Sequence, residues 1–298
     1  MQDGELPSRD LILNGRKRKV YGSAPDDHYF RTLGDESEWP FIRFCERCIR
    51  DDYNCLDIGA NIGLMALHIA DYCTSGRIVC VEPNRPVFEA LQNTLRANVV
   101  ANAIAVNAAI TERDGDVRFT EDSAYGYIEP SGTALVEGIT VETLLERCRM
   151  KRVDFIKMDV EGHEPVILRA ALDLIKRQRP LIFMEFNSWS LIQNHVEPLG
   201  FLEWIIQEFN FVHVVRHGQG ARDLLMRVTT KNAKSIMFDN LIKHGCVDDL
   251  VVTDDASKLN LARNIEVGAK KAENLRRSSM FSGVEALLKK VSLLTRKD

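Results

Sequence analysis

Two short stretches of this sequence combine glycine and carboxylate side chains in a pattern that can hold an adenosine-bearing cofactor. They are residues 55–63, CLDIGANIG, and residues 78–83, IVCVEP. Gly59 and Gly63 let the backbone approach a ligand closely, and Glu82 can accept hydrogen bonds from both hydroxyl groups of a ribose. We therefore expect Gly59, Gly63 and Glu82 to bind the nucleoside part of a cofactor.

The glycine spacing and one acidic residue indicate which cofactor this is. Dinucleotides favour G-x-G-x-x-G, because a pyrophosphate needs several free backbone N–H groups at the start of the helix. Here Asn61 and Leu64 replace two glycines of such a pattern. Asp57 adds a carboxylate that would repel a pyrophosphate and attract the ammonium group of an amino acid. The pattern favours S-adenosylmethionine (SAM) over NAD.

Three further residues are expected at the cofactor. Asn61 is expected where the backbone takes an unusual angle or where the methionine part of SAM lies, with helix capping as the alternative. Asn107 and Ala108 end the third expected strand, and they are expected to contact the adenine mainly through shape and backbone groups.

Residues 159–164, DVEGHE, supply the candidates for catalysis. An alcohol does not ionise at neutral pH, so methyl transfer to a hydroxyl needs a base or a metal. Asp159 is the first candidate, Glu161 the second, and His163 has a suitable intrinsic pKa but could simply cap the next helix. Glu185 ends another apolar strand; it could hold the acceptor or join Asp159 around a divalent cation, and the need for a metal stays open.

Apolar runs at 55–58, 78–81, 104–109, 155–158 and 181–186 alternate with helical periods. This alternation is typical of a parallel sheet covered on both faces, with ligands at the carboxyl ends of its strands. We expect an α/β, Rossmann-like, doubly wound and mostly parallel sheet of seven strands. Two strands at 211–216 and 224–228 are expected at an antiparallel edge, and residues 120–138 as a surface loop or small ribbon.

Composition limits the other possibilities. A formal net charge of −4 gives no reason to expect nucleic acid as a partner, and seven scattered cysteines fit reduced thiols. No apolar run is long enough to span a membrane, and no secretory signal is evident. A cytoplasmic location follows as the expectation.

Three organisational parts are expected: a lead-in or substrate cap at 1–50, the catalytic domain at 51–256, and a basic helical tail at 257–298. The tail carries an apolar stripe among lysines and arginines. It could contact the inner surface of a membrane, pack on the domain or pair with another subunit, and the oligomeric state stays open.

Three segments of the chain together resemble the FkbM family of SAM-dependent methyltransferases. They are LDIGANIGLMAL (56–67), VCVEPNRPVFEALQNTLRAN (79–98) and VDFIKMDVEGHEPVILRAA (153–171). The resemblance implies a class I methyltransferase fold and methyl transfer from SAM, often to a hydroxyl of a sugar or polyketide-like acceptor. The expected acceptor is a carbohydrate or a related small hydroxylated molecule.

Two alternatives remain open. One is an NAD(P)-dependent oxidoreductase, which would need the third glycine and a catalytic Tyr-Lys or His arrangement that we cannot locate. The other is a noncatalytic module that binds SAM without turnover; the carboxylates at 159, 161 and 185 argue mildly against it.

Overall fold

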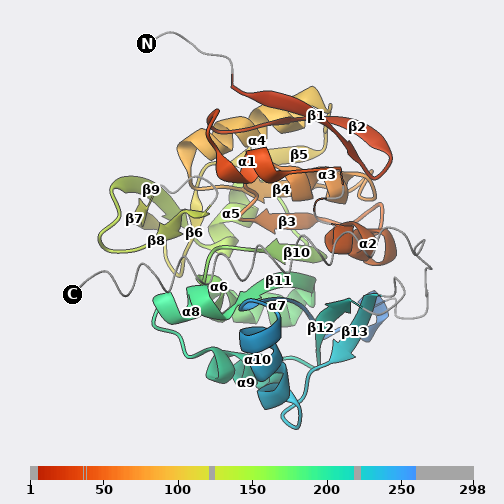
Figure 1. Ribbon diagram of the computed structural model, residues 1–298, viewed down its shortest axis with the longest axis vertical. Helices are drawn as coiled ribbons and strands as arrows, with labels where there is room; N and C mark the ends of the chain where they lie inside the picture. Colours follow the sequence, from red (N-terminus) through yellow and green to blue (C-terminus); the bar gives the residue numbers. More distant parts are fainter. Residues whose placement is uncertain (1–5, 36, 38, 121–124, 218–222, 260–298) are drawn as a thin grey trace.

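A mixed sheet of eight strands forms the centre of the protein (Figure 1). The computed structural model describes residues 6–35, 37, 39–120, 125–217 and 223–259. In spatial order the strands run β5-β4-β3-β10-β11-β14-β12-β13. Their bounds are β3 (Cys55–Ile58), β4 (Ile78–Val81), β5 (Ala103–Val106), β10 (Phe155–Met158), β11 (Leu181–Asn187), β12 (Phe211–His217), β13 (Asp223–Arg227) and β14 (Val247–Thr253).

The five strands β3, β4, β5, β10 and β11 are parallel to one another. The chain runs outward from β3 through β4 to β5 and then returns to β10, on the other side of β3. The strand order therefore reverses between β3 and β10, which is where doubly wound sheets bind ligands. The predicted α/β, doubly wound class is confirmed.

The antiparallel part of the sheet is larger than the sequence predicted. The edge strands β12 and β13 are present and pair antiparallel, as expected. One further strand, β14, lies between β11 and β12 and is antiparallel to both, so the sheet has eight strands and not seven. Asp248 and Asp249 interrupt the apolar run of β14, which is why its periodicity did not predict a strand.

Helices cover both faces of the sheet, because successive residues of each buried strand point to opposite sides. Leu56 and Ile58 of β3 belong to one core cluster, whereas Cys55 belongs to the other. The helices are α1 (His28–Thr32), α2 (Trp39–Cys48), α3 (Leu64–Ala70), α4 (Arg85–Ala97), α5 (Val141–Arg147), α6 (Glu164–Ala170), α7 (Leu172–Gln178), α8 (Ser188–Gln193), α9 (Pro198–Glu208) and α10 (Ala233–Lys243), with a 3₁₀ turn η2 (Ala256–Lys258).

The N-terminal segment forms a hairpin that packs on the domain. β1 (Ser8–Leu13) and β2 (Arg16–Tyr21) pair antiparallel and lie over α4 (Figure 1). Asp71, almost fully buried, forms ion pairs with Arg16 and Arg18 of the hairpin. Two helices of the expected N-terminal cap, α1 and α2, reach the cavity described below. The domain boundary at residue 50 stays a prediction.

A second, four-stranded sheet occupies the region expected to be a loop or ribbon. Its order is β6-β9-β7-β8. The strands are β6 (Ala109–Ile110), β7 (Gly115–Thr120), β8 (Tyr127–Ile128) and β9 (Ala134–Ile139). The third expected strand, 104–109, is thus divided between β5 and β6, because the chain leaves the central sheet after Val106.

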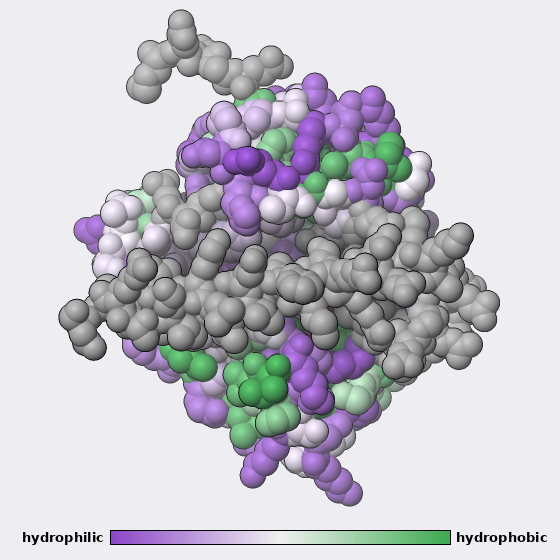
Figure 2. All heavy atoms as spheres, in the orientation of Figure 1, coloured by the Kyte–Doolittle hydropathy of each residue, from purple (hydrophilic) through white to green (hydrophobic). Residues whose placement is uncertain are grey.

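Polar and apolar residues are distributed unevenly over the surface. Figure 2 shows hydrophilic residues over the N-terminal hairpin and apolar residues gathered over α8 and α10. The exposed apolar side chains of these helices are Ile192, Phe238, Leu241 and Ile242. No helix in the described residues is long and apolar enough to cross a membrane. The expected basic tail lies, from residue 260 onward, outside the described residues.

A prediction about the hydrophobic core concerns Phe155, which is fully buried and packs against the rings of Phe41 and Phe44. We expect Phe155→Ala to lower the free energy of unfolding by about 3–5 kcal/mol, because truncation leaves a cavity in a close-packed interior. Urea unfolding would measure it. The control Phe238→Ala, at a side chain that is 58% exposed, should change stability by less than about 0.5 kcal/mol. Equal effects of both variants would contradict the assignment of this core.

Candidate functional site

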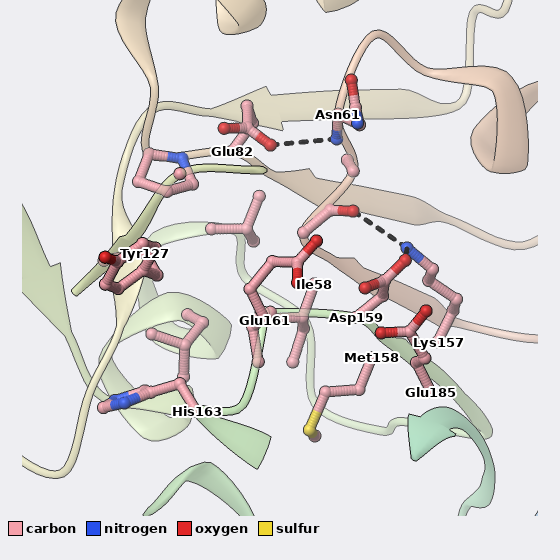
Figure 3. A pocket seen from close by; sticks show the side chains of 18 of the residues that line it. Ile58, Asn61, Glu82, Tyr127, Lys157, Met158, Asp159, Glu161, His163 and Glu185 are labelled. Atoms are coloured by element: carbon pink, nitrogen blue, oxygen red, sulfur yellow. Dashed lines mark hydrogen bonds and ion pairs between the residues drawn. The ribbon is translucent and has the colours of Figure 1, made fainter. Parts of the chain in front are cut away.

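A cavity of about 270 Å³ lies at the carboxyl ends of the central strands. Its walls come from the ends of β3, β4, β10 and β11, from the second sheet, and from α1 and α2. Glu82 and Asn61 lie at one end, while Asp159, Lys157 and Glu185 lie at the other (Figure 3). Residues from most of the length of the domain therefore meet in a single cavity.

Glu82, directly after β4, is fixed by two backbone amides. Its Oε2 accepts a hydrogen bond from the Asn61 backbone N–H at 3.0 Å, and its Oε1 accepts one from the Asn84 N–H at 2.9 Å. Burial raises the pKa of Glu82 to about 7, although both amides lower it. A carboxylate removed from water in this way has remaining lone pairs for the hydroxyl donors of a ligand.

The turn after β3 has glycine at two positions where the backbone adopts a positive φ. Gly59 has φ +75°, and a Cβ built there would lie 1.8 Å from the Asp159 carbonyl oxygen. Gly63 has φ +93° and begins α3. Gly59 lines the cavity, whereas Gly63 does not. Gly59 allows β3 and the end of β10 to lie close together. Gly63 completes the turn that leads from β3 into α3.

Asn61 takes the unusual backbone angle that the sequence suggested, with φ +50°. Its Oδ1 accepts from the Ile62 N–H at 2.8 Å, and its backbone N–H holds Glu82. Asn107 does not line the cavity; its Nδ2 donates to the carbonyl oxygens of Glu82 and Pro83, each at 2.9 Å. Ala108 is buried and lines the cavity wall. Asn107 thus supports the Glu82 backbone, while Ala108 faces the ligand space.

Asp57 lies beneath the cavity and does not line it. The side chain is fully buried, and the Lys157 ammonium is 3.7 Å from Asp57 Oδ1. Burial raises the pKa of Asp57 to about 6, against the opposing effect of Lys157. The expected direct contact of Asp57 with a cofactor ammonium is therefore not available here, because Lys157 occupies the position beside its carboxylate.

Lys157 connects the two central strands at the point where their order reverses. Its Nζ donates to the Gly59 carbonyl oxygen at 2.9 Å and lies 3.4 Å from Asp159 Oδ2. The side chain is 7% exposed. A buried ammonium of this kind is stabilised by its partners. It holds the carboxylates of Asp57 and Asp159 on either side of one positive charge.

Acidic side chains gather at this end of the cavity. Asp159, Glu161 and Glu185 all line it, as does Asp249, which is the direct partner of Glu185 in the pairing of β14 with β11. Burial raises the pKa of Glu185 well above its ordinary value, and the charges of Asp159 and Glu161 add to the effect. Glu185 Oε2 is buried and accepts no hydrogen bond. Glu185 is therefore the carboxylate most ready to take up a proton.

The segment after β10 does not continue as a strand. Glu161 has φ +53° and Gly162 φ +94°. The turn is fixed from α8, since Ser190 Oγ donates to Glu161 Oε2 at 3.1 Å and Asn194 Nδ2 donates to its carbonyl oxygen at 3.1 Å. The turn after β10 therefore brings both Asp159 and Glu161 to the cavity.

His163 and Glu164 begin helix α6. His163 lines the cavity, makes no side-chain cap and has a pKa lowered by burial, so its ring is neutral at neutral pH. Glu164 is buried, and its Oε1 accepts from the Val160 N–H at 2.9 Å. Glu164 thus closes the turn that presents Asp159 and Glu161.

Tyr29, Tyr125, Lys157 and Asp249 are among the lining residues that were not predicted as site residues. Lys157 stands two residues before Asp159, and a lysine inside an apolar strand is a signal that could have been used. Asp249 could not be placed because its strand was missed. The two tyrosines come from segments without clear periodicity.

The described residues contain no group of three or more His, Cys, Asp or Glu arranged to hold a metal ion. The idea that Glu185 joins Asp159 around a divalent cation thus gains no support. The side chains of Cys45 and Cys48 are buried.

A doubly wound sheet with a cavity at its switch point defines a Rossmann-like α/β protein, and the carboxylate of Glu82 at the end of its second parallel strand lines this cavity. The chain belongs to the FkbM methyltransferase family: the family model described as "Methyltransferase FkbM domain" matches residues 57–215. The match spans β3 to β12, which includes the residues of the cavity that follow the parallel strands.

The similarity to individual relatives is low in sequence identity. The chain is 26% identical over 144 residues to the hexuronic acid methyltransferase AglP of Haloferax volcanii, which covers 47% of this chain and 58% of the relative. A methyltransferase FkbM structure from Methylobacillus flagellatus is 17% identical with a TM-score of 0.42, covering 68% of this chain and 44% of that one. The chain thus spans little more than half of the curated relative and less than half of that structure.

A third similar structure is TYW2 from M. jannaschii in complex with AdoMet. It is 13% identical with a TM-score of 0.43, covering 85% of this chain and 87% of that one.

The pKa of Glu164 is raised by burial from an ordinary 4.5 to about 8. The folded protein holds this proton more tightly than the unfolded chain, so the free energy of unfolding should fall as pH rises between these two values. Glu164→Gln keeps an acceptor for the Val160 N–H without the charge. We expect it to be more stable than the unsubstituted protein at high pH, by on the order of 2–4 kcal/mol, and little different at low pH.

Urea unfolding across this pH range measures the difference. Glu146→Gln, at an exposed position of α5, is the control and should follow the unsubstituted protein. If the free energy of unfolding changed with pH in the same way in Glu164→Gln and in the unsubstituted protein, the Glu164 proton would not be linked to folding.

Proposed function

We propose that this protein is an SAM-dependent O-methyltransferase that acts on a hydroxyl group of a carbohydrate. The observation that carries the proposal is a single cavity with a ribose-type acceptor, Glu82, at one end and the carboxylates of Asp159 and Glu185 at the other. Family membership supplies the class of reaction. One cavity thus offers a place for a cofactor and, beside it, groups that can accept a proton.

The residues at the Glu82 end fit the nucleoside part of the cofactor. The two amides that hold Glu82 use one lone pair of each oxygen, which leaves acceptors for the two ribose hydroxyls. Hydroxyl donors would also favour the ionised form of a carboxylate whose pKa burial has raised to about 7. Gly59 and Ala108 leave space for a close backbone approach.

When bound, SAM supplies an electrophilic methyl group, and the bond from carbon to the acceptor oxygen forms as the carbon–sulfur bond breaks and sulfur keeps the electron pair. Glu185 takes the proton of the acceptor hydroxyl, since its raised pKa makes it a stronger base than an ordinary carboxylate. Asp159, held by Lys157, orients that hydroxyl. Glu161 and His163 line the same space and complete the acceptor side.

A carbohydrate is favoured as the acceptor by two observations. The curated relative AglP is named for methylation of a hexuronic acid. The cavity combines carboxylates with Tyr125 and Tyr127, and aromatic faces with hydrogen-bond acceptors suit a ring that carries several hydroxyls.

The first prediction of this assignment concerns the cofactor. Glu82→Gln removes the charge and one of the acceptors, so S-adenosylhomocysteine should bind about 10- to 100-fold more weakly. Calorimetry measures this. Affinity of the unsubstituted protein should rise with pH through about 7, where Glu82 ionises, and the rise should be absent in the variant.

Glu89→Gln, exposed on α4, is the matched control for Glu82→Gln and should bind normally. NAD, titrated in parallel, should give no binding heat; tight NAD binding without S-adenosylhomocysteine binding would favour the oxidoreductase alternative and reject the proposal.

The second prediction concerns the base. A mass-spectrometric screen of sugars for the gain of one methyl group in place of hydrogen identifies an acceptor, and the rate with that acceptor should rise with pH as Glu185 ionises. Burial and then the Asp159 charge raise the pKa of Glu185, so Asp159→Asn should move this rise to lower pH.

The control for Asp159→Asn is Asp173→Asn, at an exposed position of α7, which should leave the pH profile unchanged. If the pH dependence of the rate is the same in Asp159→Asn as in the unsubstituted protein, Glu185 is not the base. Cofactor binding with no methylated product from any hydroxylated compound would instead support the noncatalytic module.

A further inference from the structure

One aromatic side chain in the wall of the cavity is exposed over nearly half of its surface. Tyr125 lines the cavity and is 47% exposed. The other aromatic residues that line it in the described part of the chain are buried or half-buried, namely Tyr29, Phe41, Phe119, Tyr127 and Phe183. A single exposed aromatic side chain on an open surface is ordinary, but in a concave site it offers apolar area that a ligand can cover.

The second sheet fixes the backbone that carries Tyr125. The next residue, Gly126, lies so close to β7 that a Cβ built there would be 2.5 Å from the Phe119 ring and 2.7 Å from the Thr120 carbonyl oxygen. Tyr127 then pairs with Thr120 where β8 joins β7. Tyr125 is therefore held within two residues of a paired strand, so the sheet determines where its ring enters the cavity wall.

The charges around Tyr125 indicate which side of the cavity it serves. Burial raises the pKa of Tyr125, and nearby carboxylates raise it further, those of Glu161, Asp27, Glu185 and Asp159. Three of these carboxylates line the acceptor side of the cavity, and Asp27 caps α1. The hydroxyl of Tyr125 thus stays protonated at neutral pH, and the side chain lies near the acceptor carboxylates.

A pyranose ring matches this combination of groups. When its hydroxyl groups are equatorial, the axial C–H bonds form two apolar faces, and the hydroxyls point outward around the ring. An aromatic side chain can cover one C–H face while carboxylates accept hydrogen bonds from the hydroxyls at its edge. An acyclic polyol carries similar hydroxyls but has no rigid apolar face, and it loses more conformational freedom on binding.

We propose that Tyr125 is a specificity-determining residue, on whose ring the acceptor stacks one C–H face of a pyranose with equatorial hydroxyls. This inference rests on the proposed function and specifies both the ring form of its acceptor and the residue that selects it. The carboxylates of the acceptor side then bind hydroxyls at the edge of the stacked ring.

The test uses the full chain saturated with S-adenosylhomocysteine and two probes, methyl β-D-glucopyranoside and the acyclic polyol sorbitol. Titrations followed by proton NMR of the probes measure both affinities. The glucoside should bind about 10-fold more tightly than sorbitol. Its axial C–H protons should shift upfield on binding, because they lie over the face of an aromatic ring, and the protons of sorbitol should not.

Two substitutions separate the ring of Tyr125 from its hydroxyl. Tyr125→Leu keeps apolar bulk but removes the aromatic face, so the glucoside should bind about 10-fold more weakly and lose its upfield shifts. Tyr125→Phe keeps the face and should retain the shifts and most of the affinity. Both variants should bind S-adenosylhomocysteine with unchanged affinity.

The matched control is Phe238→Leu, which removes an exposed ring from α10, outside the residues that line the cavity. It should bind both probes as the unsubstituted protein does.

The outcomes separate this inference from the proposed function. Absence of S-adenosylhomocysteine binding would reject the proposed function itself. With normal S-adenosylhomocysteine binding, three results would each reject stacking on Tyr125 alone: no binding of the glucoside, equal binding of the glucoside and sorbitol, or unchanged glucoside affinity in Tyr125→Leu. Equal losses in Tyr125→Leu and Tyr125→Phe would assign the contact to the hydroxyl and would also overturn the inference.

Discussion

The site depends on one buried ammonium group, that of Lys157. It joins the end of β10 to the turn after β3 by donating to the Gly59 carbonyl oxygen, and it lies between the carboxylates of Asp57 and Asp159. These two strands meet where the strand order of the sheet reverses. Removing one partner from a buried ion pair leaves an uncompensated charge. Lys157, Asp57 and Asp159 therefore stabilise one another in this arrangement. These three side chains therefore form a fixed arrangement at the base of the cavity.

Desolvation then gives the two ends of the cavity different properties. At one end, Glu82 is held by two backbone amides, and its pKa rises to about 7. At the other, burial raises the pKa of Glu185 well above its ordinary value, and nearby carboxylates raise it further than burial alone. The first carboxylate is poised to accept hydrogen bonds and the second to accept a proton. In the proposed function, the nucleoside-bearing cofactor uses the first property and the hydroxylated acceptor uses the second.

Several elements could be predicted from the sequence because their causes are local. β3, β4 and β10 have the predicted bounds, since each is a short apolar run in which all four residues are buried. The positive φ of Asn61 and Gly59 follows from a tight turn between strand and helix. β14 could not be predicted, because two aspartates interrupt its pattern and it owes its place to long-range pairing with β11 and β12. The N-terminal hairpin was missed for a similar reason: its buried residues face α4, which is distant in the sequence.

The sequence by itself determined the family, the parallel core and the set of carboxylates that end its strands, because residue type and spacing along one strand and one turn are local properties. The tertiary structure decided which of these groups face the ligand. It buried Asp57 beneath Lys157, turned Asn107 toward the Glu82 and Pro83 carbonyls, and placed Asp249 beside Glu185. Those outcomes depend on charge, burial and pairing between segments up to about 220 residues apart in the chain, for example those of Tyr29 and Asp249, which line the same cavity, and no local pattern contains them.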